Sequence, residues 1–162
     1  MSRQVKNIFA ITAFLICIAL INIAGQNIEL EIRGMNAFTF ILIVAVLLQI
    51  LFFIPSFIFK TEKYYDLVGS LTYVTTISLA YFSVDDKTTI DSIIYFYVMI
   101  WASRLGIYLF RRVRNDGKDV RFEKAKRHFF WFLQYWMGQA LWVSLTACAA
   151  IIAILSPEED TL

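Results

Sequence analysis

The stretch AFTFILIVAVLLQILFFIPSFIF, residues Ala37 to Phe59, decides the fold class because it contains no charged side chain. A helix that crosses the hydrocarbon core of a bilayer needs about 20 mostly apolar residues. In lipid, only helices and closed barrels satisfy their own backbone hydrogen bonds, and this stretch does not alternate as a barrel strand does. It therefore predicts a transmembrane helix.

The same pattern recurs along the chain, which is 59% hydrophobic with a mean hydropathy of +0.65. An ordinary soluble domain is about 45–50% apolar. We expect an all-α integral membrane bundle of about five transmembrane helices that forms a single domain over residues 1–162. The remaining predicted spans are Ile8 to Ala24, Leu67 to Phe82, Ile90 to Phe110, and Phe129 to Leu155. The span that begins at Leu67 is the weakest, because it is short and rich in Ser and Thr.

The distribution of Lys and Arg predicts the orientation. The segments that flank the predicted spans alternate between the two sides of the membrane. Those on one side contain twelve Lys and Arg residues, whereas those on the other side contain only Arg33 and Lys87. The positive-inside rule then places the N-terminus on the cytoplasmic or matrix side and the C-terminus on the opposite side. The endoplasmic reticulum, the bacterial inner membrane and the mitochondrial inner membrane all fit this pattern.

Composition also excludes some chemistry. The chain has one histidine, His128, and its two cysteines, Cys17 and Cys148, lie far apart within apolar segments. No HExxH or phosphate-loop motif is present. We expect neither a metal site nor a nucleic-acid partner.

Arg104 is the one basic residue inside a predicted span, two helical turns or about 10 Å from Arg111. A charge at that depth in the membrane is energetically costly and therefore indicates a functional site. The alternative is that Arg104 extends to the interface or pairs with Asp66 at the same side. Gln134 and Gln139 occur at a similar depth. Together with Arg104 they predict a polar layer that holds a cofactor headgroup, a lipid headgroup or only its own hydrogen bonds.

The basic loop, residues 111–128, reads RRVRNDGKDVRFEKAKRH. One interpretation is a topology determinant that also contacts anionic lipid headgroups. The other is phosphate binding by arginines that neighbouring carboxylates hold in place.

Several motifs resemble the steroid 5-alpha-reductase-like membrane reductases. They are WASRLGIYLFRR from Trp101 to Arg112, GKDVRF from Gly117 to Phe122, and DLVGS from Asp66 to Ser70. The resemblance covers roughly Tyr64 to Leu145. It implies a helical membrane enzyme that reduces an activated carbon–carbon double bond in a steroid or other lipid with NADPH. By this resemblance, cofactor-binding positions would be Arg104, Arg111, Asp119 and Arg121, whereas the resemblance indicates no catalytic residue.

Members of that family continue through a second half with an Arg-His-Pro-Asn-Tyr-like stretch, which the residues up to Leu162 do not include. We therefore expect no NADPH binding by this chain alone and hold two functional hypotheses. In the first, the chain is a non-catalytic accessory subunit that packs against other membrane subunits. In the second, it belongs to an NADPH-dependent lipid reductase. The sequence does not indicate the substrate or the oligomeric state.

Overall fold

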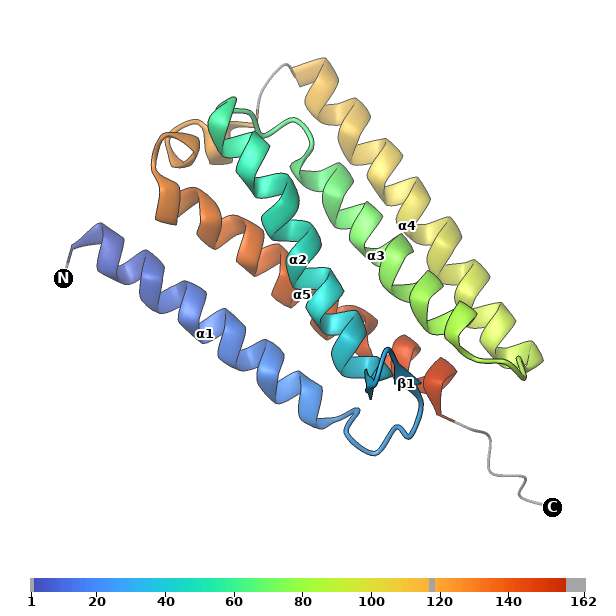
Figure 1. Cartoon of the computed structure of the whole chain (residues 1–162). Coiled ribbons are helices and arrows are strands. Elements are labelled where there is room, and N and C mark those ends of the chain that lie inside the picture. The colour runs from blue at the N-terminus through green and yellow to red at the C-terminus, as the bar shows by residue number, and fades with distance from the viewer. Residues whose placement is uncertain (1, 117–118, 157–162) are drawn as a thin grey trace.

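The computed structural model describes residues 2–116 and 119–156, and this part of the chain folds as a bundle of long helices in which successive helices run antiparallel (Figure 1). The predicted all-α membrane bundle is confirmed. The helices are α1 (Arg3–Ile23), α2 (Ala37–Ile58), α3 (Tyr65–Ser83), α4 (Thr89–Asp116) and α5 (Phe129–Leu155).

Four of these helices, α1, α2, α4 and α5, are long and apolar enough to cross a membrane. Helix α3 is not among them, because it carries many hydroxyl side chains. Its Thr72 and Thr76 are nonetheless fully buried, and each hydroxyl donates a hydrogen bond to a carbonyl one turn earlier in α3. Gln49 of α2 donates from Nε2 to Oγ1 of Thr72 at 2.9 Å. Helix α3 is therefore a polar element inside the bundle.

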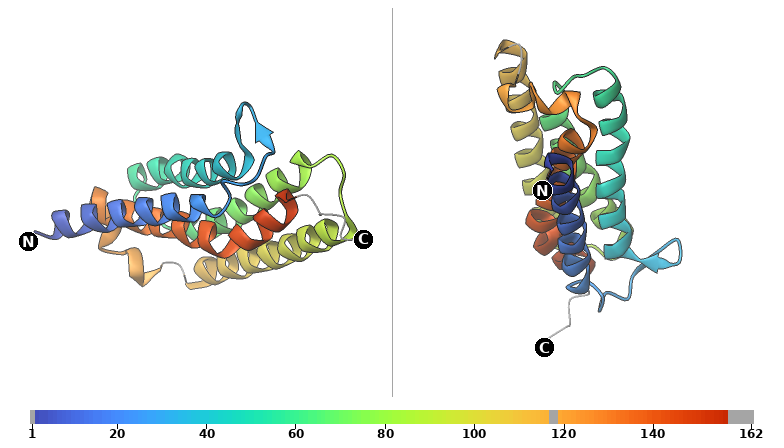
Figure 2. Two further views of the ribbon diagram at one scale, coloured as in Figure 1. Left: turned by 90° about the horizontal axis from the view of Figure 1, so that it is seen from below. Right: turned by 90° about the vertical axis from the view of Figure 1, so that its left-hand side faces the viewer.

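The helices do not share the packing equally. Helix α5 packs against α1, α2 and α3, whereas α4 packs almost entirely on α3 (Figures 1 and 2). The backbones of α3 and α4 approach closely at Gly106, where a Cβ atom would lie 2.4 Å from Oγ of Ser70. The opposite face of α4 is left uncovered.

The basic residues gather at one end of the bundle. This is the end where α1 and α5 begin and α4 ends (Figure 1). Among the described residues, every Lys and Arg lies at this basic end except Arg33, Lys87 and Arg104. Helix α5 ends at the other end of the bundle. That the basic end faces the cytoplasm or matrix stays a prediction.

A short hairpin joins α1 to α2 at the end opposite the basic end. Strands β1 (Glu31–Ile32) and β2 (Met35–Asn36) pair antiparallel. Arg33 and Gly34 both have positive φ, 55° and 76°, as a two-residue type I′ turn requires. Asn36 fastens the preceding loop, because its Nδ2 donates to the carbonyls of Gly25 and Ile28.

Candidate functional site

The basic loop folds back onto the start of α3 at the basic end. Its described part contains two short 3-10 helices, η1 (Val120–Phe122) and η2 (Ala125–Arg127). The Phe122 ring is 1% exposed and lies 4.7 Å from the ring of Tyr65 and 4.9 Å from that of Tyr135, centroid to centroid. Tyr65 also donates to the carbonyl of Tyr135 at 2.9 Å. An aromatic side chain thus anchors a strongly charged loop.

An ion network lies beside this anchor and joins Asp119, Arg121, Asp66 and Arg112. Both carboxylate oxygens of Asp119 accept from Nε of Arg121 at 3.0 Å. Oδ2 of Asp66 lies 3.4 Å from Nη2 of Arg112 and 3.7 Å from Nη2 of Arg121. The hydrogen bonds from Arg121 hold the pKa of Asp119 below its ordinary value, and the same bonds raise the pKa of Arg121. The two side chains therefore largely neutralise each other.

A third carboxylate, Glu62, holds the loop from the connection between α2 and α3. Oε2 of Glu62 lies 2.6 Å from Nζ of Lys126, and its side chain is only 3% exposed. Oε1 accepts from the backbone N–H of Asp119 at 3.2 Å. Glu62 thus binds both described halves of the loop, η1 through Asp119 and η2 through Lys126.

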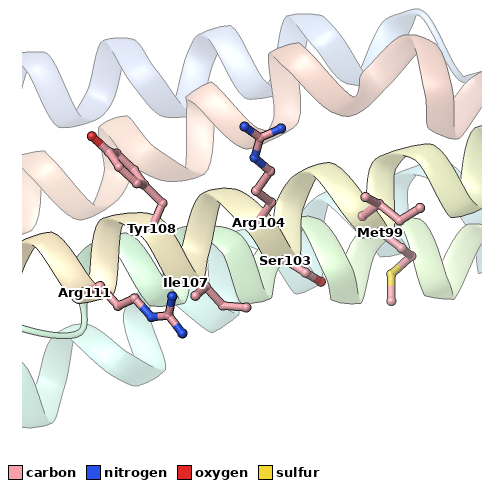
Figure 3. Close-up of a pocket in the computed structure, with 7 residues that line it drawn as sticks. Met99, Ser103, Arg104, Ile107, Tyr108 and Arg111 are labelled. Carbon is pink, nitrogen blue, oxygen red and sulfur yellow. The ribbon is translucent and has the colours of Figure 1, made fainter.

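A separate open groove of about 660 Å³ runs along the uncovered face of α4 (Figure 3). Arg104 and Tyr108 project to the same side of the helix, and Arg111 follows toward the basic end. Within the described part of the chain, Arg104 makes no hydrogen bond or ion pair. The lining residues all belong to α4 and are Met99, Ile100, Ser103, Arg104, Ile107, Tyr108 and Arg111.

The alternative that Arg104 pairs with Asp66 is wrong, because the Asp66 carboxylate is engaged by two other arginines. The expected polar layer also does not form around Arg104. Gln139 packs its amide against Gly69 inside the bundle, where a Cβ on the glycine would lie 2.4 Å from Nε2. Arg104 instead lies on the outer face of α4, which has few contacts with α5.

The four residues expected at a cofactor site therefore divide into two places. Asp119 and Arg121 lie together in the ion network, whereas Arg104 and Arg111 line the groove on α4. Sequence reasoning missed Glu62. Its signal was an acidic residue between Lys60 and Lys63, the two other charged residues of that connection. Among residues 2–116 and 119–156, no group of three or more His, Cys, Asp or Glu side chains is placed to hold a metal ion.

Comparison with protein families matches residues 52–162, more than half of the chain, to a family described as a protein of unknown function, DUF1295. The chain belongs to the DUF1295 family. The ion network, the Glu62 contacts and the α4 groove all fall inside the DUF1295 region, whereas α1 lies outside it. No curated protein and no solved structure matches the chain. The molecule is thus a multi-pass helical membrane protein of the DUF1295 family.

Proposed function

We propose that the chain is a non-catalytic accessory subunit of a larger membrane assembly, in which other transmembrane helices cover the outer face of α4. The observation that carries this proposal is the exposed guanidinium of Arg104, which has no partner within the described residues. A charge at the centre of a membrane-spanning helix costs about 2.5–3.5 kcal/mol on insertion scales, which is an upper limit for Arg104 at about 10 Å from Arg111. A covering helix that supplies a hydrogen-bond acceptor offsets that cost.

The surroundings of Arg104 support the same arrangement. Trp101 is 49% exposed and Ile100 is 68% exposed, so the face around the charge is broad and apolar. Exposed apolar side chains alone are ordinary in lipid, so the charge of Arg104 is what indicates a covering helix. Helix association in membranes relies on packing and interhelical hydrogen bonds, and this face offers both.

In this proposal the ion network has a structural function. The hydrogen bonds between Asp119 and Arg121 use most of the carboxylate's acceptor capacity and leave little charge for a ligand. The network then holds the basic loop over the end of the bundle, where it reinforces the orientation of the chain in the membrane.

The proposal is tested by photocrosslinking in the native membrane. A photoreactive amino acid replaces Ile100 on α4 or, as a matched control, Leu20 on α1, which is 59% exposed on another side of the bundle. We expect protein adducts of defined mass at position 100 and lipid adducts at position 20. Arg104→Gln should reduce the protein adduct several-fold. Lipid adducts alone at both positions would contradict the accessory role.

A second candidate function is supported by the groove itself. The motifs from Trp101 to Arg112 and from Gly117 to Phe122 resemble steroid 5-alpha-reductase-like reductases, and the groove joins a cationic strip to an apolar, lipid-facing surface. In an NADPH-dependent reductase of a carbon–carbon double bond, Arg104 and Arg111 would contact the phosphates of the cofactor, which supplies the hydride. Tyr108 would add a hydroxyl group beside them.

NADPH titration separates the two candidates. The purified chain in nanodiscs is titrated with NADPH, and energy transfer from tryptophan to the nicotinamide reports binding. The reductase candidate requires saturable binding that Arg104→Gln and Arg111→Gln weaken and that Lys6→Gln, an exposed change on α1, leaves unaltered. Such binding by the chain alone would contradict the accessory role. A flat titration would remove the evidence for a cofactor site in the groove.

A further inference from the structure

A cleft of about 290 Å³ lies at the basic end, between the start of α3 and the last turns of α4. Its lining consists of Lys63, Tyr64, Phe110, Val113 and Arg114. The rings of Tyr64 and Phe110 stack with their centroids 6.2 Å apart and form an aromatic wall. The volume is near the lower limit of about 300–1,000 Å³ that is typical of small-molecule pockets. The cleft can hold a group of headgroup size.

The two cations of this cleft, Lys63 and Arg114, differ from the cations that pair with carboxylates elsewhere at the basic end. Arg112, Arg121 and Lys126 each lie within 4 Å of a carboxylate oxygen. The side-chain cations of Lys63 and Arg114 make no ion pair or hydrogen bond in the part of the chain that the structure describes. Two uncompensated positive charges therefore face one cleft, which favours an anion.

The position of the cleft indicates which anion. Phe110 is half-buried within the membrane-spanning helix, while Arg114 lies one turn further toward water. Tyr64 is 51% exposed, and tyrosine is enriched at the boundary between lipid and water. One side of the cleft thus faces water and the other side faces hydrocarbon, as a ligand with a charged head and acyl chains requires.

We propose that this cleft binds the phosphate of an anionic phospholipid between Lys63 and Arg114, with the lipid glycerol and first acyl carbons against Tyr64 and Phe110. The site is separate from the α4 groove and does not depend on the function proposed for it. Basic residues near a membrane surface each strengthen anionic lipid binding by about fivefold. Loss of both cations should therefore weaken binding by about 25-fold.

Native mass spectrometry of the full chain in detergent tests the site, with added phosphatidylglycerol or phosphatidylcholine as the probe. We expect phosphatidylglycerol adducts to need about 25-fold more lipid in the Lys63→Gln, Arg114→Gln double variant. The matched control is the Lys6→Gln, Lys124→Gln double variant, which removes the same charge from exposed positions at the same end. The control should change binding by less than about twofold, because its charges lie outside the cleft and salt screens exposed charges beyond about 10 Å.

Three results would overturn the proposal. Equal loss in the control variant would mean that only total charge matters. Equal binding of phosphatidylcholine would mean that the phosphatidylglycerol charge is not recognised. Displacement of the lipid by millimolar glycerol 3-phosphate would mean that the cleft takes a soluble phosphate rather than a lipid.

Discussion

Replacement of Glu62 by glutamine should make the basic loop open from the bundle more often while the transmembrane helices stay folded. The carboxylate of Glu62 is the point at which two parts of the loop meet, through Nζ of Lys126 at 2.6 Å and the N–H of Asp119 at 3.2 Å. Glutamine keeps the shape and one acceptor oxygen but removes the charge. The variant therefore isolates the ionic part of the contact.

The magnitude follows from the exposure of the two partners. Breaking a fully buried ion pair costs about 3–5 kcal/mol. Here Glu62 is 3% exposed but Lys126 is 22% exposed, so the released ammonium regains some water. We therefore expect the range for a hydrogen bond to a charged group, about 1.5–3 kcal/mol. At 1.4 kcal/mol per factor of ten, the open loop becomes roughly 10- to 150-fold more populated.

A buried cysteine measures this opening. Ala125 in η2 is fully buried, so a maleimide reaches an Ala125→Cys side chain only after the loop opens. The background carries Cys17→Ala and Cys148→Ala to remove the native thiols. When reclosing is faster than labelling, the labelling rate is proportional to the open population. We expect Glu62→Gln to accelerate labelling by the factor given above.

The matched control is Lys124→Gln, an exposed cation in the same loop without an ion pair in the described residues, which should change the rate by less than about twofold. Lys126→Met should accelerate labelling as Glu62→Gln does, and the double variant should cost less than the sum of the two. Identical labelling rates for Glu62→Gln and the parent would refute the conclusion that the ion pair stabilises the docked loop.

Two further perturbations test the helix packing and the ion network. Gly106→Ala should destabilise the bundle by about 1–3 kcal/mol, because the new Cβ would lie 2.4 Å from Oγ of Ser70. The measurement is the melting temperature in detergent, which should fall. Gly138→Ala, whose new Cβ would make an ordinary contact of 3.4 Å, should leave the melting temperature unchanged, and Ser70→Gly should rescue Gly106→Ala. Because Arg121 lowers the pKa of Asp119, this carboxylate stabilises the docked loop above its ordinary pKa of about 3.9 and loses that effect as the pH falls through its folded-state pKa. Hydrogen exchange of residues 119–127 should show protection that declines below about pH 4, and an equal decline in Asp119→Asn would contradict the assignment.

The fold class could be predicted from the sequence because hydrocarbon imposes one dominant constraint, the internal satisfaction of the backbone. The helix bounds depend on more local forces. Helix α4 begins near the predicted Ile90 but continues beyond Phe110 to Asp116, since arginines are good helix formers once the chain leaves the lipid. Hydropathy shows where the apolar segment ends, at Arg111, but the helix itself continues into water.

The candidate site was less predictable because its contacts join residues far apart in the chain. The spacing of Asp119 and Arg121 indicates that they can meet, since they are two residues apart. No pattern in the sequence predicts that Glu62 pairs with Lys126 or that the Phe122 side chain of the loop is buried. For Arg104, hydropathy indicates the depth in the membrane, whereas the close approach of the two backbones at Gly106 decides which side of α4 faces α3.

The polarity of α3 bears on how the protein is made. During synthesis, α3 emerges before α4, and it is less apolar than the four helices that could cross a membrane by themselves. Its partner α4 follows after a connection of only a few residues, and the Ser70 hydroxyl donates to the carbonyl of Ala102 across their interface. We expect α3 to enter the membrane together with α4 as a helical hairpin, so that the insertion machinery must retain the first helix until the second has been synthesised.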